Sequence, residues 1–300
     1  MEIKYDNQDR EWLSCISDKK RADHSKNWLK QDNLDYWRHQ RMLNPLMAFI
    51  NKKDKWLTLG DGRYGSEANF LINKGVDALA TDFSDHLLKK SKEIGFIHKY
   101  KKENAENLSF KDNEFDYVLI KEALHHFPRP WLALYEAFRV CKKGVIIIEP
   151  NDQNSCNPKL HKKFFNLIIN LYKVILRHRL NKDGYGFEEV GNFIYTTNNR
   201  ELEKFLLGMH FNKIAHKKLN DHYIKGIEYL KLNNKSVINR FKILSFKLIL
   251  KLKDFLNLIG LIDNSLNLNM LFKEDPEKET IKKMVAFNWE YKELPNNPYI

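Results

Sequence analysis

The chain has 300 residues, of which 43% are hydrophobic and 30% charged, and its formal net charge is +12. This composition is typical of a globular protein with a large core, and it excludes a small scaffold held together by disulfides. No apolar run approaches the ~18 residues of a membrane-spanning helix, and the first fifteen residues lack the apolar core of a secretory signal. Cys15, Cys141 and Cys156 are an odd number at spacings unrelated to a zinc site. We therefore expect a cytoplasmic protein.

The excess of positive charge has two explanations. A basic chain is typical of proteins that bind nucleic acid or an anionic membrane surface. The sequence is also rich in lysine, asparagine and isoleucine, a bias that arises without any ligand. Both explanations stay open, and the position of the charges along the chain decides how they are weighed.

The first fifty residues carry apolar side chains at loosely helical spacing and predict helices. From Lys55 to Glu149, short apolar runs alternate with helical patterns. The predicted strands are "WLTLG", "VDALATD", "FDYVLI" and "GVIIIEP", and the predicted helices lie at 66–74, 85–93 and 130–140. Near-continuous apolar strands that alternate with helices favour a parallel sheet covered on both faces. The predicted fold class is α/β, with a doubly wound core.

Beyond Pro150 the pattern becomes helical and basic. The segment "KLHKKFFNLIINLYKVILRHRL" predicts a helix without acidic residues, and "TTNNRELEKFLLGMHFNKIAHKKLNDHYI" predicts a capped helix that ends near Gly208, followed by a strand. A second basic segment, at 235–260, carries an apolar stripe that we expect to pack against the sheet with its lysines in solvent. The stripe consists of Val237, Phe241, Leu244, Leu248, Leu252 and Phe255. "SLNLNMLFKEDP" predicts a final strand, and "NWEYKELPNNPYI" a tail.

A glycine-rich stretch, "LGDGRYG", follows the first predicted strand. Gly60, Gly62 and Gly65 leave no side chain between backbone amides and a ligand, as in nucleotide-binding loops, although a tight turn needs the same residues. Asp82 ends the second predicted strand, 22 residues after Gly60, where a carboxylate can accept hydrogen bonds from ribose hydroxyls. Helix capping by Asp82 or Ser84 is the alternative.

A third stretch, "ENAENLSFKDNEFDYVLIKEALHHF", contains a polar loop and then an apolar strand that ends in polar residues. Taken in order, the three stretches resemble the class I S-adenosylmethionine-dependent methyltransferases, over about residues 54–150. The resemblance implies a Rossmann-like, mostly parallel sheet of seven strands. It also implies S-adenosylmethionine as cofactor and S-adenosylhomocysteine as product. The implied organisation is a helical cap (1–53), a cofactor-binding core (54–155), a helical insertion and lid (156–197), and a completion of the sheet with basic helical additions (198–300).

The resemblance also assigns cofactor contacts. Those expected at the methionine part are Gly60, Asp61, Gly62, Gly65, Lys121 and Glu122. Asp82 would hold the ribose, and Phe83, Asn104 and Ala105 the adenine. The chain departs from the family where Thr58 replaces an acidic residue, where Arg63 and Tyr64 lengthen the loop, and where Asn104 replaces a common aspartate. A non-catalytic cofactor-binding protein is therefore an alternative.

Methyl transfer depends mainly on in-line positioning, and an oxygen acceptor of high pKa also needs a base. We expect His125 or His126 to be that base, since histidine titrates near neutral pH, with Tyr195, Glu149 and His222 as weaker candidates. Capping and packing are the alternative roles of the paired histidines. No carboxylate and histidine cluster has the spacing of a metal site, so we expect a metal-independent reaction.

The acceptor is expected to lie against elements outside the shared core, with "GYGFEEVGNFIYTT" at 184–197 as a lid. Our preferred acceptor is an oxygen of a small molecule or sugar, from a surface glycan or its nucleotide-linked precursor. The basic helices favour two alternatives: RNA, and a lipid reached by peripheral membrane contact. The sequence leaves the oligomeric state open.

Overall fold

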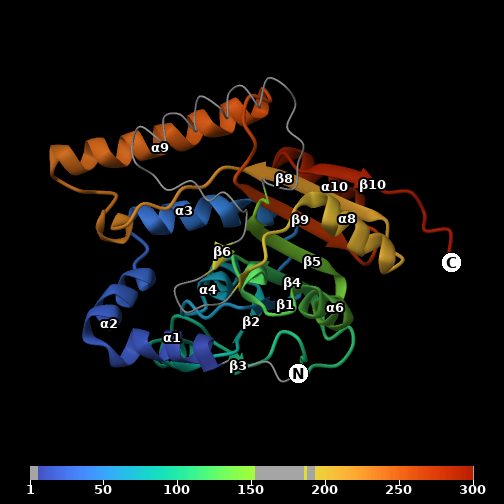
Figure 1. Ribbon diagram of the computed structural model, residues 1–300, viewed down its shortest axis with the longest axis horizontal. Coiled ribbons are helices and arrows are strands. Elements are labelled where there is room, and N and C mark those ends of the chain that lie inside the picture. Colours follow the sequence, from blue (N-terminus) through green and yellow to red (C-terminus); the bar gives the residue numbers. More distant parts are fainter. Residues whose placement is uncertain (1–5, 153–185, 188–192, 300) are drawn as a thin grey trace.

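Figure 1 shows the computed structural model, which describes residues 6–152, 186–187 and 193–299. Its central sheet has, within these residues, eight strands in the order β3-β2-β1-β4-β5-β9-β8-β10. The strands are β1 (Lys55–Leu59), β2 (Asp77–Asp82), β3 (Tyr100–Lys102), β4 (Phe115–Lys121), β5 (Cys141–Pro150), β8 (Lys213–Leu219), β9 (Leu266–Phe272) and β10 (Glu290–Glu293). All pairings among β1 to β5 are parallel, whereas β9, β8 and β10 pair in antiparallel fashion.

The predicted α/β core is confirmed. The four predicted strands correspond to β1, β2, β4 and β5, and the three helices to α4 (Ser66–Ile72), α5 (His86–Glu93) and α6 (Pro130–Val140). Successive residues of a strand face opposite sides of the sheet, and here both sides are covered. Trp56 and Leu57 of β1 accordingly lie in two different hydrophobic clusters, and both are fully buried.

Helices from the N-terminal segment cover part of the sheet and reach the carboxyl ends of its strands. They are α1 (Asp6–Ser17), α2 (Lys19–Ser25), the 3-10 turn η1 (Lys26–Leu29), α3 (Leu34–Leu43) and the 3-10 turn η2 (Asn44–Ala48). The predicted helical start is thus confirmed. The side chains of Asp18 and Asn33 cap α2 and α3 by accepting hydrogen bonds from Arg21 N–H and Tyr36 N–H.

The C-terminal part agrees with the sequence in three elements and differs in two. Helix α8 (Asn199–Gly208) begins with a capping box of Asn198 and Glu201, and β8 and β9 lie where strands are predicted. The predicted tail at 288–300 is wrong, because β10 lies within it and pairs with β8, and α10 (Lys278–Ala286), just before it, has no counterpart among the predicted elements. Among the described residues, the sheet therefore has one strand more than the seven expected. Trp289 fixes the segment, since its buried indole N–H donates to the carbonyl of Pro45, 3.1 Å away.

Helix α9 (Val237–Leu258) forms within the second basic segment, but its predicted orientation is wrong. The residues that it buries are Ile243, Phe246 and Leu250, which pack with Leu34 of α3 and with Ile227 rather than against the sheet. The apolar stripe expected to pack on the sheet is exposed instead. Figure 1 shows α9 beside α3, at the edge of the molecule.

Two predicted features lie wholly or partly outside the described residues. The basic helix expected at 159–180 is one of them. Of the expected lid, only Gly186–Phe187 (β6) and residues 193–197 are described, and β6 pairs with β7 (Phe193–Ile194). Among the described helices, none is both long enough and apolar enough to cross a membrane.

Candidate functional site

A cavity of about 430 Å³ opens beyond the carboxyl ends of β1, β2 and β4. The strand order changes direction between β1 and β4, which is the position where open α/β sheets bind ligands. The cavity volume is in the range of small-molecule sites. One wall consists of the loops after these strands, and the other of α1, α2, η1 and α3.

The three glycines of the loop after β1 have different roles. Gly60 lines the cavity with φ +71°, and a Cβ there would come 2.4 Å from Cβ of Ala123, so the position excludes any side chain. A Cβ on Gly62 would come 2.7 Å from the carboxylate of Asp82. Gly65 packs away from the cavity against Ile97, with φ +69° at the start of α4. Of the three, Gly60 is therefore the one that lines the cavity.

Asp61, a predicted methionine contact, is buried beneath the loop and does not line the cavity. Its carboxylate accepts hydrogen bonds from the Thr58 hydroxyl (2.8 Å) and from the backbone N–H groups of Glu67 (3.2 Å) and Ala68 (2.9 Å). Burial raises its pKa well above the usual range, and neighbouring Glu67 adds to the effect. Asp61 thus stabilises the first turn of α4, and Thr58 is its partner rather than a second acid.

The wall beyond β2 and β3 carries the predicted ribose and adenine residues. Asp82, Phe83, Asn104 and Ala105 all line the cavity. Burial raises the pKa of Asp82 to about 7, although the backbone N–H groups of Ser84 and Gly62 donate to its carboxylate. The Asn104 side chain accepts from the N–H of Glu106 at 3.0 Å, which holds the loop in shape. A buried carboxylate with so few donors is suited to a ligand that supplies more of them.

Lys121 and Glu122, the other predicted methionine contacts, lie at the opposite side of the cavity, where Lys121 ends β4 and Glu122 follows it. The ammonium of Lys121 lies 3.1 Å from carboxylate oxygens of both Glu67 and Glu122. Burial disfavours the charge of Glu122, but Lys121, Arg38 and Arg63 outweigh burial and lower its pKa to about 2. Glu122 also has a left-handed backbone, with φ +48°. Its ionised carboxylate can accept hydrogen bonds from an ammonium group.

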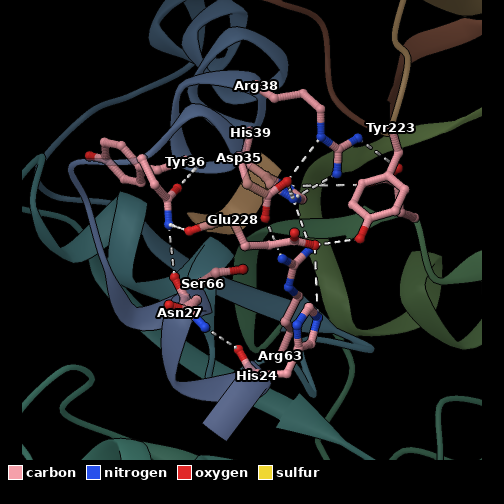
Figure 2. Close-up of polar contacts among 12 residues, drawn as sticks. His24, Asn27, Asp35, Tyr36, Arg38, His39, Arg63, Ser66, Tyr223 and Glu228 are labelled. Carbon is pink, nitrogen blue, oxygen red and sulfur yellow. Dashed lines mark hydrogen bonds and ion pairs between the residues drawn. The ribbon is translucent and has the colours of Figure 1, made fainter. Parts of the chain in front are cut away.

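Helix α3 contributes a charged network that the sequence did not predict (Figure 2). Arg63, the residue that lengthens the glycine loop, donates to His39 Nε2 at 2.9 Å and forms an ion pair with Asp35. Arg38 pairs with Asp35 at 3.1 Å and with Asp221. Burial, together with Lys121, Arg63 and Arg38, lowers the pKa of His39 well below its usual value. The sequence does place Asp35, Arg38 and His39 at helical spacing. It does not show that Arg63 is their partner.

Aromatic side chains from the N-terminal helices form the far wall. Trp12, His24 and Trp28 line the cavity. The guanidinium of Arg63 lies 4.5 Å from the centroid of the Trp28 ring, and His24 meets the same ring edge-on at 5.7 Å. Buried Glu228, 3.8 Å from His24, accepts a hydrogen bond from Tyr223 (Figure 2). This wall therefore combines ring faces with cationic groups.

The predicted bases differ in whether they line the cavity. His126 lines the cavity, whereas His125 contacts Glu149, whose other oxygen accepts from the N–H groups of Ala123 and Leu124, both at 2.8 Å. The N–H of Tyr195 donates to the His125 carbonyl at 2.9 Å, and the Tyr195 ring lies outside the cavity.

His222 is exposed, and it too does not line the cavity. His126 therefore has the best position among the five predicted bases. The described residues include no group of three or more histidine, cysteine or acidic side chains arranged to hold a metal ion.

Comparisons with known proteins show what the chain is similar to. Residues 57–148 match a family model described as a methyltransferase domain. The chain is 29% identical over 140 residues to a demethylmenaquinone methyltransferase of Staphylococcus haemolyticus, covering 44% of this chain and 57% of the relative. It is 29% identical over 127 residues to the protein of the same name from Staphylococcus saprophyticus, covering 39% and 52%. The chain therefore spans about half the length of these relatives.

Among solved structures, a S-adenosylmethionine-dependent methyltransferase from Archaeoglobus fulgidus is 16% identical, over 78% of this chain and 92% of its own, with a TM-score of 0.47. The family match includes the ends of β1, β2 and β4, which are strands whose carboxyl ends border the cavity. Residues 57–148 are therefore similar to a methyltransferase domain.

Proposed function

We propose that the protein transfers a methyl group from S-adenosylmethionine to an oxygen atom of a small molecule or sugar. The observation that carries the proposal is the cavity itself, in which Asp82 and Phe83 lie on one side, Lys121 and Glu122 on the other, and Gly60 lies on the wall beside them. S-adenosylmethionine supplies an electrophilic methyl group on a sulfonium with a good leaving group.

The cavity residues fit this cofactor. The Asp82 carboxylate would accept hydrogen bonds from both ribose hydroxyls, which would favour its ionised form. Phe83 would lie along the adenine, and Asn104 and Ala105 at its edge. Ionised Glu122 would hold the ammonium of the methionine part, and Arg63, exposed in part, would face its carboxylate.

His126 would act as the base. The centroid of its ring lies 3.9 Å from that of His125, with the two planes tilted by 45°, and His125 is held in place by Glu149. This support from His125 fixes the His126 ring, so that it would take a proton from the acceptor hydroxyl at a defined position. The remaining acceleration would come from in-line positioning of acceptor and methyl group.

The wall of Trp12, His24 and Trp28 supports a ring-shaped acceptor, because indole faces stack on sugars and on flat rings. Our preferred acceptor remains a hydroxyl of a surface glycan or its nucleotide-linked precursor. The two relatives named for demethylmenaquinone favour a small molecule in general, without identifying it.

Calorimetry with S-adenosylmethionine and S-adenosylhomocysteine tests cofactor binding, and transfer of labelled methyl to nucleotide sugars, glycans, quinones, lipids and RNA tests the acceptor. We expect binding of both cofactor forms and transfer to a sugar. Binding without transfer to any acceptor would favour the non-catalytic alternative. Transfer to RNA or lipid would replace the sugar assignment, and absence of binding would contradict the proposal as a whole.

A further inference from the structure

Helix α9 is apolar on two opposite sides. One side, with Ile243, Phe246 and Leu250, is buried against α3 and Ile227. The other side is exposed, and we call it the outer face of α9. The outer face consists of Val237, Phe241, Leu244, Leu248, Leu252 and Phe255. Their exposed fractions range from 53% to 79%.

The outer face is continuous. At 3.6 residues per turn, its six residues fall within about 80° of the helix circumference. Ile238 and Ile249 widen it, with 68% and 48% of their surfaces exposed. Single exposed leucines are ordinary, but a contiguous apolar face of this length marks an interaction surface.

Cationic side chains border the outer face on both sides. By helical geometry, Arg240 and Lys251 lie along one border, and Lys242 and Lys253 along the other. Lys247 instead places its ammonium over the Trp37 ring of α3, 4.9 Å from the centroid. The one acidic residue of α9, Asp254, forms an ion pair with Arg41 of α3. The charge beside the outer face is therefore almost entirely positive.

We propose that the outer face of α9 docks on an anionic lipid bilayer, with the helix lying in the plane of the headgroups. The apolar side chains would enter the boundary between headgroups and acyl chains, where in-plane amphipathic helices are buried by about 5–10 Å. Lysine and arginine side chains at the borders would extend to lipid phosphates while their methylene stems remain in contact with apolar surface.

The charges distinguish a bilayer from three other occupants. A second copy of α9 would bring the same cations together, and the chain's own segment at 159–180, with Lys and Arg but no acidic residue, would do likewise. Single-stranded RNA binds cationic grooves with stacking aromatic rings, whereas four of the six residues of the outer face are aliphatic. The anionic headgroups of a bilayer match the cationic borders, and its apolar interior matches the outer face.

This surface is joined to the cavity through α3. Phe246 of α9 meets Trp37 of α3 edge-on at 6.4 Å, and α3 also supplies Asp35, Arg38 and His39 to the charged network. Docking would therefore bring a membrane to the N-terminal side of the cavity. The inference goes beyond the proposed function, which does not require a membrane.

Co-sedimentation of the full chain with vesicles tests the proposal. We expect binding to vesicles of phosphatidylcholine with phosphatidylglycerol at least ~10-fold tighter than to phosphatidylcholine alone, since each basic residue near the surface adds about 1 kcal/mol. Phe241→Ser with Leu248→Ser should reduce binding to the anionic vesicles at least ~10-fold. Lys242→Gln with Lys251→Gln should remove most of the preference for phosphatidylglycerol.

Matched controls keep the test specific. Ile94→Ser with Val285→Ser removes two exposed apolar residues away from α9, and Lys278→Gln with Lys282→Gln removes two cations of α10. Both controls should bind vesicles as the unchanged protein does. Circular dichroism and S-adenosylmethionine affinity, unchanged in every variant, would show that the fold is intact.

A fluorescent label identifies what covers the outer face. Leu248→Cys is labelled in a Cys156→Ser background, since Cys15 and Cys141 are buried. We expect the emission to shift to the blue only when anionic vesicles are added. A blue emission in buffer alone would show that the chain or a second copy covers the face, and would overturn the proposal. Equal vesicle binding by the α9 variants, or binding of RNA but not of vesicles, would also overturn it.

Discussion

The guanidinium of Arg63 lies over the indole of Trp28, 4.5 Å from the ring centroid, and so connects the glycine loop to the N-terminal helices. Arg63 is one of the residues that lengthen this loop, and it also contacts Asp35 and His39 of α3. The longer loop therefore does not simply fill the cavity. It anchors the wall formed by the N-terminal helices.

Arg63→Gln should weaken S-adenosylmethionine binding by at least ~10-fold, because it removes a cation from the cavity and leaves buried Asp35 without one of its partners. Calorimetry measures this effect. Arg200→Gln is the control, since Arg200 lies exposed on α8 and pairs with Glu203. Equal affinity of Arg63→Gln and the unchanged protein would contradict the role given to the longer loop.

Asp82→Asn should weaken cofactor binding by about 30-fold, since two hydrogen bonds to a charged acceptor are worth at least ~2 kcal/mol. Asp85→Asn, on the same loop but away from the cavity, is the matched control. An unchanged affinity in Asp82→Asn would remove the ribose assignment. Both affinities are measured by calorimetry at one pH.

The same substitution should change how stability depends on pH. The pKa of Asp82 is raised from 3.8 to about 7 in the folded protein, so between these values the folded state binds a proton that the unfolded state releases. The contribution of Asp82 to stability is therefore present at low pH and is lost as the pH rises to about 7, by about 4 kcal/mol. Urea denaturation should show that the stability of Asp82→Asn rises relative to that of the unchanged protein between about pH 4 and about pH 7. A difference that does not depend on pH would contradict the raised pKa.

His126→Gln and His125→Gln should have different effects. His126→Gln should lower kcat about 100-fold or more with little change in cofactor affinity, as expected for loss of a general base. His125→Gln should instead lower the free energy of unfolding by about 1–3 kcal/mol, because it removes the imidazole that contacts buried Glu149. Steady-state kinetics and urea denaturation separate the two effects. A normal kcat in His126→Gln would exclude it as the base.

Trp289→Ala should destabilise the fold by about 3–5 kcal/mol, since the indole is buried and donates to the Pro45 carbonyl. Tyr299→Ala, at a position 90% exposed, is the control and should have almost no effect. Thermal and urea unfolding measure both. Equal stabilities would show that the segment around β10 is dispensable.

The parts of the fold that the sequence predicted are those where local pattern and burial agree. Strands β4 and β5 are almost wholly buried, so their uninterrupted apolar runs could be read directly. Strand β10 has the sequence "EYKE" and buries none of its side chains fully, so its pairing with β8 is a tertiary outcome without a local signal. Helix α9 is apolar on both sides, and periodicity alone does not tell which side is buried.

The candidate site likewise contains some residues that the sequence could predict and others that it could not. Gly60 and Asp82 could be predicted because the ends of β1 and β2 meet at one edge of the sheet. Asp61 lies in the same motif, yet it stabilises α4 from below the loop, because its carboxylate accepts a hydrogen bond from the Thr58 hydroxyl. The network of Asp35, Arg38 and His39 depends on how α3 docks on the core. No spacing within the chain carries that information.

The six tryptophans lie in different surroundings, so the intrinsic fluorescence of this protein can report ligand binding. Trp12 and Trp28 line the cavity, whereas Trp56 and Trp289 are buried in the core. A molecule that enters the cavity alters the surroundings of the first two indoles and leaves the other two as they are. Intrinsic fluorescence, without any label, should therefore follow each ligand as it enters and leaves.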